Sequence, residues 1–182
     1  MMKRSQVLWI LWEYHLLTPM AKPPAMPATP ATRVLRAAGV PFEGHAYKYE
    51  DRGGTSVCAR ELRVDEHAVV KTLVMRTDAG DALLVLMHGD AQVSAKELAR
   101  HLGVKAVSPS DPREAERLTG YQVGGTSPFG LKKPLPVYME QTILELPVIY
   151  INGGRRGFLV SMSPADAARL LAATPVSAAT AG

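Results

Sequence analysis

Residues 69–88 read VVKTLVMRTDAGDALLVLMH, and this stretch decides the fold. Both halves are dense in valine, leucine and methionine, and short apolar runs rich in β-branched residues are typical of strands. Between them, Asp78-Ala79-Gly80-Asp81 is a sequence that favours a tight turn. The stretch therefore predicts a β-hairpin in which the strand Val69–Arg76 pairs with the strand Ala82–Met87.

Helical and strand patterns alternate on both sides of this hairpin. A helix is expected wherever a serine, threonine or aspartate precedes an amphipathic run. The expected helices start at the caps Thr32, Thr55, Ser94, Asp111 and Ser163, and three of them stop at Gly39, Gly103 and Gly120. Further strands are expected at 42–49, 104–107, 137–139, 148–152 and 158–161, with a turn at Gly153-Gly154. This interleaving predicts a single α/β (α+β) domain around a mixed sheet.

Composition sets the limits of that domain. The chain has 182 residues, of which 47% are hydrophobic and 21% charged, so it can bury a sizeable core and is not wholly disordered. We expect the folded domain at residues 31–174. Residues 1–30 hold five of the 14 prolines and predict a flexible N-terminal extension. Residues 175–182 are small and polar and predict a frayed tail.

Charge and targeting signals narrow the class of protein. The excess of 21 basic over 17 acidic residues is too small for a dedicated DNA-binding protein, although Lys132-Lys133 and Arg155-Arg156 offer local contacts to nucleic acid. The apolar run Val7–Trp12 is too short to cross a membrane, and the charged Glu13 comes directly after it, so it makes a poor export signal. With a single cysteine, the chain is expected in the cytoplasm.

Many catalytic motifs are missing from the sequence. It contains no GxSxG, HExxH, GxxxxGK[ST] or GxGxxG pattern. Its five histidines are scattered without metal-ligand spacing, which favours surface or sheet-edge positions. Cys58 lies between Val57 and Ala59, which favours a buried thiol over a nucleophile. No metal or organic cofactor is therefore expected.

Three features carry candidate chemistry. Lys71 interrupts an apolar strand, where it either points outward to solvent or lines a cleft and holds an anionic or carbonyl oxygen. The segment Thr119–Gly130, TGYQVGGTSPFG, has four glycines and is either a long turn or a loop whose amides approach a ligand. The segment Asn152–Gly157, NGGRRG, is either a hairpin turn or a part of a site whose arginines meet phosphates.

In this order and spacing, these segments resemble the YbaK/EbsC family of aminoacyl-tRNA deacylases, which is related to the editing domain of bacterial prolyl-tRNA synthetases. The matching pieces are Val70–Leu73, His88–Asp90, Thr119–Gly130 and Ile149–Gly157, and the resemblance covers roughly 32–173. It implies a compact domain with a mixed, barrel-like sheet flanked by helices. It also implies hydrolysis of the ester between a wrong amino acid and tRNA.

The resemblance further implies roles for particular residues. Lys71 aligns with the family's essential lysine, and an amide of Gly124 or Gly125 is expected to hold the ester carbonyl. The expected substrate-binding residues are Tyr47, Thr72, Ser127, Pro128, Asn152, Gly153 and Gly154. Attack comes from water or from the substrate's own thiol.

The expected substrate is Cys-tRNA(Pro), and the alternatives are Ala-tRNA, another small mischarged residue, or binding without catalysis. The expected partners are the aminoacylated 3′ end of tRNA and a prolyl-tRNA synthetase, with neither DNA nor a membrane.

Overall fold

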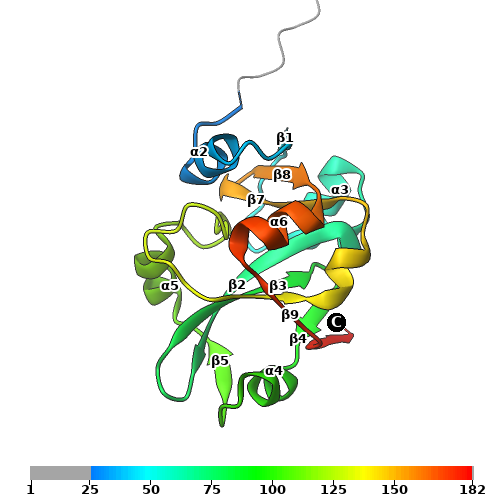
Figure 1. Ribbon diagram of the computed structural model, residues 1–182. Helices are drawn as coiled ribbons and strands as arrows, with labels where there is room; N and C mark the ends of the chain where they lie inside the picture. The colour runs from blue at the N-terminus through cyan, green and yellow to red at the C-terminus, as the bar shows by residue number, and fades with distance from the viewer. Residues whose placement is uncertain (1–25, 182) are drawn as a thin grey trace, which may run out of the picture.

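The computed structural model describes residues 26–181, which form one mixed sheet with helices packed against both of its faces (Figure 1). The eight-stranded sheet has the order β1-β8-β7-β2-β3-β6-β9, with β5 also paired to β2, and β10 pairs separately with β4. The strands are β1 (Glu43–Ala46), β2 (Val69–Thr77), β3 (Ala82–His88), β4 (Ala91–Val93), β5 (Val107–Pro109), β6 (Val137–Glu140), β7 (Ile149–Arg155), β8 (Phe158–Met162), β9 (Thr174–Val176) and β10 (Ala179–Ala181). The prediction of one α/β domain around a mixed sheet is confirmed.

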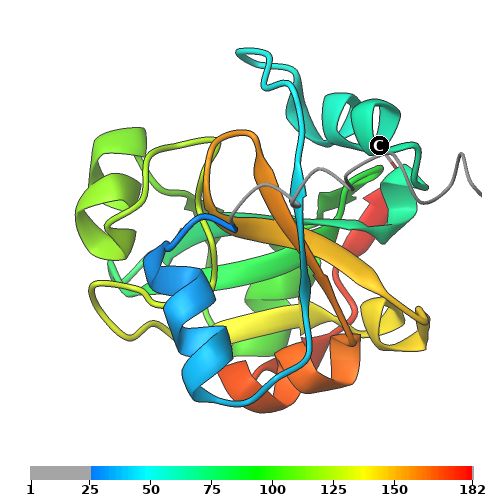
Figure 2. The same cartoon turned by 90° about the horizontal axis from the view of Figure 1, so that it is seen from above.

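The helices lie in two layers. They are α2 (Pro30–Ala37), α3 (Gly54–Leu62), α4 (Ala95–Leu102), α5 (Pro112–Thr119) and α6 (Pro164–Leu171), with short 3-10 turns η1 (Glu66–Ala68) and η2 (Gln141–Glu145). Figure 2 shows α2 in blue and α6 in orange-red along one side of the sheet, with α3 in teal on the other. None of the helices in the described part of the chain has the length and apolarity needed to span a membrane.

The hairpin that the sequence predicts is at the centre of the sheet. β2 and β3 pair antiparallel from Val70 opposite His88 to Arg76 opposite Ala82. On β3, Leu84 and Leu86 face the core cluster that includes α2 and α6, whereas Leu83 and Val85 face the cluster that includes α4. Both faces of β3 are therefore covered, which explains why its sequence is almost continuously apolar.

The helix caps were predicted well where the chain makes them locally. Ser94 Oγ accepts the Glu97 N–H, and Asp111 and Ser163 also cap the helices expected of them. The prediction for the first helix is wrong by one turn, because Thr29 is the cap and Thr32 its reciprocal partner. Thr55 is not a cap either, because the N-cap residue of α3 is Gly53 and the Thr55 hydroxyl turns to Glu66 and Gly89.

Three strand boundaries also differ from the prediction. Gly153-Gly154 is not a turn, because β7 continues to Arg155 and the chain reverses at Arg156-Gly157. An irregularity in the β7–β8 register between Asn152 and Arg155 lets the strand pass through the two glycines. The strand expected at 42–49 is shorter, and that expected at 104–107 begins only at Val107.

The C-terminal tail is ordered, which corrects the prediction that it frays from residue 175. β9 pairs parallel with β6, and β10 pairs antiparallel with β4. Val176 and Ala178 are each 1% exposed, and the Glu140 carboxylate accepts the Ala178 and Ala179 amides. The small side chains of the tail pack closely where β9 pairs with β6 and β10 pairs with β4, so their size does not indicate disorder.

The other predicted extension falls mostly outside the described residues, which begin at 26. At its inner end, the boundary at residue 30 is too late, because Pro30 already starts α2 and Met26 packs against the main core. Thr29 also belongs to the domain, since its hydroxyl donates to the Gly153 carbonyl.

The packed tail can be tested by truncating one side chain. Val176→Ala should lower the free energy of unfolding by about 1.5–3 kcal/mol, because it removes buried apolar groups and leaves a cavity. Ser177→Ala, at the exposed neighbouring position, should change it by less than about 0.5 kcal/mol. Urea denaturation of both variants measures the difference, and equal stabilities would mean that the tail does not pack.

Candidate active site

Lys71 is half-buried on β2, and two backbone carbonyls hold its side chain. Nζ donates to the carbonyl oxygen of Gly89 at 3.1 Å and to that of Ala91 at 2.5 Å. Gly89 lies in the turn that connects β3 to β4, and Ala91 is the first residue of β4; both come near the lysine because β3 is the antiparallel partner of β2. An ammonium has three N–H groups, and within residues 26–181 the third has no protein acceptor. Lys71 can therefore donate one hydrogen bond to a ligand.

The electrostatic environment of Lys71 contains opposing contributions. Burial lowers the pKa of its amine, while the carboxylates of Glu66 and Asp90 act in the opposite direction and raise it. No carboxylate makes a direct ion pair with Nζ within the described residues. Its charge is therefore held by neutral dipoles and stays available to an anionic or carbonyl oxygen.

The glycine loop after α5 is fixed by the β7–β8 hairpin. Asn152 Nδ2 donates to the Gly124 carbonyl at 3.2 Å, and Arg156 Nε donates to the Val123 carbonyl at 2.8 Å. A Cβ on Gly125 would lie 2.9 Å from the Arg156 amide nitrogen, so the loop can approach this closely only with glycine there. The loop and the NGGRRG segment therefore lie in direct contact.

The two candidate amide donors differ in this loop. The Gly125 N–H donates to the Gln122 carbonyl at 2.8 Å and closes a turn. The Gly124 N–H makes no hydrogen bond to any residue that the structure describes. Gly124 is exposed and adopts a φ of +86°, which favours glycine. Of the pair, Gly124 is the one whose amide is available to a ligand.

Asn152, which holds the glycine loop, lies on the same face of the sheet as Lys71. β2 and β7 run parallel, with Val70 beside Ile151, and the next residues along the two strands are Lys71 and Asn152. Matching residues of parallel neighbours point to the same face of a sheet. Lys71 and Asn152 thus leave the sheet on the face opposite to Val70 and Ile151, which are buried in the main core.

A cavity of about 340 Å³ lies against the loop. Its lining consists of Gly120, Tyr121, Gln122, Gly125, Gly154, Arg155 and Arg156. The predicted residues Gly125 and Gly154 therefore meet here, beside two arginines. Lys71 is not part of this lining, so the structure places the lysine on the neighbouring strand and outside the cavity.

Four other predicted binding residues lie beneath the surface or on another face. Ser127 is fully buried, and its hydroxyl accepts the Phe129 amide, which shapes the loop from inside. Pro128 and Gly153 are buried as well. Thr72 extends from the opposite face of β2 to Lys71, as strand alternation requires. Direct contact of these four with a substrate stays a prediction.

Tyr47 packs against Cys58, which lies on α3. Burial, followed by the contact with Cys58, raises the pKa of the Tyr47 phenol. Burial also raises the pKa of the Cys58 thiol, whose Sγ donates to the Gly54 carbonyl at 3.3 Å. The prediction of a buried thiol is confirmed, and the raised pKa disfavours the thiolate form.

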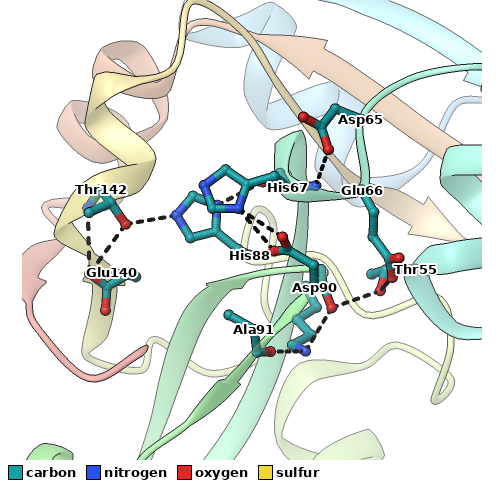
Figure 3. A network of polar contacts seen from close by, with 11 residues as sticks. Thr55, Asp65, Glu66, His67, His88, Asp90, Ala91, Glu140 and Thr142 are labelled. Atoms are coloured by element: carbon teal, nitrogen blue, oxygen red, sulfur yellow. Dashed lines mark hydrogen bonds and ion pairs between the residues drawn. The ribbon is translucent and has the colours of Figure 1, made fainter. Parts of the chain in front are cut away.

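A pair of histidines beside Lys71 was not recognised from the sequence (Figure 3). The rings of His67 and His88 stack with centroids 3.7 Å apart. His88 is fully buried, so the expectation of a surface or edge position is wrong for it. Its Nδ1 donates to the His67 carbonyl at 2.7 Å, and its Nε2 lies 2.8 Å from the Thr142 hydroxyl. His67 Nδ1 in turn contacts both carboxylate oxygens of Asp90.

The predicted hairpin register could have located one of the two histidines. Counting back from the turn places His88 opposite Val70, one residue from Lys71. The stacking partner His67 comes from η1 and could not be located without tertiary structure. Over residues 26–181, no group of three or more histidine, cysteine, aspartate or glutamate side chains is arranged to hold a metal ion.

Comparison with known proteins shows which family this chain belongs to. The model of the aminoacyl-tRNA editing domain matches residues 50–170, which include Lys71, the glycine loop and the β7–β8 hairpin. The chain belongs to this family. The resemblance to YbaK/EbsC deacylases is thereby confirmed.

The relatives of this editing-domain protein include free-standing and fused proteins. It is 28% identical over 146 residues to a protein of Enterococcus faecalis named "Putative Cys-tRNA(Pro)/Cys-tRNA(Cys) deacylase EbsC", covering 80% of this chain and 89% of that one. It is 32% identical over 108 residues to proline–tRNA ligase of Moorella thermoacetica, covering 57% of this chain but 18% of the ligase.

A solved structure described as that of "a putative trans-editing enzyme for prolyl tRNA synthetase" matches with a TM-score of 0.70 at 23% identity, over 86% of this chain and all of that one. This last likeness supports the fold. Together, the family and the relatives support aminoacyl-tRNA deacylation as the activity of this editing domain.

The environment of Lys71 makes a direct prediction about its titration. In protein labelled with ¹³C at lysine Cε, the Lys71 resonance should titrate at a lower pH than a free lysine amine, because burial disfavours the ammonium. The assignment comes from loss of one signal in Lys71→Arg. Titration of Lys71 at the pH of a free lysine amine would contradict the half-buried geometry.

Proposed function

We propose that the protein hydrolyses mischarged aminoacyl-tRNA in trans, with Cys-tRNA(Pro) as its main substrate. One observation supports this most directly. Lys71 on β2 has an ammonium with one unused N–H, and Asn152 on the neighbouring strand β7 holds the loop whose Gly124 amide is unused. The name of the Enterococcus faecalis relative, which covers most of this chain, supports the choice of substrate.

The chemistry requires no strong nucleophile, because an aminoacyl ester is already activated. In our proposal the Gly124 N–H donates to the ester carbonyl oxygen and stabilises the negative charge that develops there. A water oxygen bonds to the carbonyl carbon, and the resulting tetrahedral adduct expels the ribose oxygen of the tRNA. That oxygen takes up the proton released by the water, which yields the free amino acid and a tRNA hydroxyl.

Lys71 would contribute through its charge. Its free N–H donates to a phosphate oxygen of the terminal adenosine or to the ester itself, and a charge-assisted contact of this kind contributes about 1.5–3 kcal/mol. The exposed Arg155 and Arg156 at the neighbouring cavity are suited to further phosphates of the same tRNA end. The site would thus combine a positioned substrate with fixed dipoles.

A cysteinyl substrate offers a second route to the same products. Its own thiol sulfur can bond to the carbonyl carbon and expel the ribose oxygen, which takes up the thiol proton, giving a cyclic thioester that water then opens to the free amino acid. Both routes need the carbonyl held by an amide, so the Gly124 and Lys71 roles are the same in each. Alanine lacks the thiol and would depend on water alone.

Discrimination between small amino acids is intrinsically weak. One methylene in a pocket changes binding by about 1–3 kcal/mol, so a cleft that accepts cysteine excludes alanine only partly. We therefore propose Ala-tRNA as the next substrate in order of efficiency. Because discrimination between small amino acids is weak, a synthetase that charges tRNA(Pro) benefits from a separate site that hydrolyses its errors. We propose that this protein supplies that site in the cytoplasm, where tRNA is charged.

A prolyl-tRNA synthetase would present the substrate. The formal net charge of +4 gives the chain little general attraction for a polyanion. The synthetase instead holds most of the tRNA and leaves its 3′ end for Lys71 and the glycine loop.

A panel of mischarged tRNAs tests the activity. Wild-type protein should deacylate Cys-tRNA(Pro) fastest, and Lys71→Ala should reduce the rate by about 10²-fold or more, because the positioning charge is lost. Lys96→Ala, at an exposed position on α4, should leave the rate unchanged within about twofold. Binding of these tRNAs without turnover would favour a non-catalytic module instead.

Adding a prolyl-tRNA synthetase tests the partner. At physiological salt, the synthetase should lower the KM for Cys-tRNA(Pro) by about tenfold, because a second contact raises the effective concentration of the 3′ end. A synthetase specific for another amino acid, added at the same concentration, serves as the control. Equal efficiency with and without the prolyl enzyme would refute this partner.

A further inference from the structure

We infer that Asp90 and His67 are positioning residues, which act through the β3–β4 turn to hold the Lys71 ammonium in place. This inference rests on the proposed function, because it assigns to the pair a part in deacylation. Neither residue needs to touch the substrate. Their effect is on the two carbonyls to which Nζ donates.

The first step is the geometry of the turn. The two acceptors of Nζ, the carbonyls of Gly89 and Ala91, directly precede and follow Asp90 in the chain. Any rotation of the backbone at Asp90 therefore moves at least one of them. Gly89 allows little alternative placement, because an added Cβ would lie 2.6 Å from the Glu66 carbonyl oxygen. The orientation of Asp90 thus sets the position of the ammonium.

The second step is the contact that orients Asp90. His67 Nδ1 lies 3.0 and 3.1 Å from the two carboxylate oxygens of Asp90. Because an ionised carboxylate only accepts hydrogen bonds, Nδ1 must be the donor. A donor shared by both oxygens fixes the plane of the carboxylate. His67 therefore restrains the turn through a contact that is separate from the strand pairing of Lys71.

The third step is the anchoring of His67 in the core. Its carbonyl accepts a hydrogen bond from Nδ1 of the fully buried His88, and the two rings are stacked. His88 Nε2 in turn meets the Thr142 hydroxyl on η2. Figure 3 shows this series of contacts from Thr142 through the two histidines to Asp90 and Ala91. The restraint on the turn thus begins at a fully buried residue.

The exposure of the pair argues against a purely structural role. The side chains of His67 and Asp90 are 43% and 45% exposed. Solvent-exposed ion pairs make little difference to stability, so this contact contributes little to folding. It nevertheless restrains the residue that lies between the two acceptors of the lysine, whereas the Thr55 hydroxyl holds only one of them, the Gly89 carbonyl, at 3.2 Å. A pair that hardly stabilises the fold but restrains the ammonium is suited to positioning.

Asp90 acts on Lys71 in a second way. Its carboxylate and that of Glu66 are the charges that raise the pKa of the Lys71 amine against the effect of burial. Neutralising Asp90 should therefore lower the pKa of the Lys71 amine further. The charged groups around Nζ within the described residues are these two carboxylates, with His67 bound to one of them.

The test compares four single variants of the full chain. Asp90→Asn and His67→Ala should lower kcat for Cys-tRNA(Pro) by about tenfold to a hundredfold and leave KM within about twofold, because a shift of about one ångström at the reacting groups has an effect of that size. His67→Asn should recover most of kcat, since its amide can donate from near the position of Nδ1. The matched control, Asp81→Asn in the β2–β3 turn, should leave kcat unchanged.

A second readout is independent of activity. The ¹³Cε resonance of Lys71 should titrate at a lower pH in Asp90→Asn than in wild type, and Asp81→Asn should not move it. The double variant His67→Ala/Asp90→Asn should have the same kcat as Asp90→Asn alone, because both changes release the same turn.

The outcomes separate the inference from the proposed function. Wild-type protein without deacylase activity on any tRNA would refute the proposed function, and the Lys71 titration would then decide the positioning role. An active wild type with kcat unchanged in Asp90→Asn and His67→Ala would overturn the inference alone. If Asp90→Asn fails to fold, the difference between His67→Ala and His67→Asn decides the same question.

Discussion

The contact between the Lys71 ammonium and two backbone carbonyls is the interaction on which the site depends. A buried ammonium needs partners, and a carboxylate would satisfy it at the expense of its charge. The carbonyls of Gly89 in the β3–β4 turn and of Ala91 at the start of β4 satisfy two of its N–H groups without neutralising it. The lysine can thus be half-buried, fixed in direction and still attractive to an anion. A flexible surface lysine would have the charge but not the direction.

The sheet order places this lysine one strand away from Asn152, the residue that holds the glycine loop. β7 lies far beyond β2 in the chain, yet the two are parallel neighbours, and their register carries Lys71 and Asn152 to the same face. Asn152 then fixes the loop through the Gly124 carbonyl. Because helices cover both faces of the central strands, the hairpin cannot slip in register without burying polar groups. The packing of the core therefore also fixes the position of Lys71 relative to Asn152.

Local signals predicted the parts of the fold that are made locally. The β2–β3 hairpin and the caps Ser94, Asp111 and Ser163 depend on residues a few positions apart, and all were found from the sequence. The ordered tail and the irregularity in β7 depend on distant partners, such as Glu140 for the tail amides. The same distinction applies to the site. Lys71 is recognisable from its apolar neighbours in the sequence, whereas the stacking of His67 on His88 depends on tertiary structure and is not.

The weak acids at α3 show how the site would work without a protein nucleophile. Tyr47 and Cys58 pack together there, and burial raises the pKa of both, which keeps the phenol and the thiol protonated near neutral pH. Neither can supply the anion that attacks an ester. The proposed mechanism relies instead on a cation of fixed direction and an unused amide, which would both stabilise charge that develops on the substrate. The rate in such a site depends on where these groups stand, so residues that hold Lys71 in place matter as much as those that touch the ester.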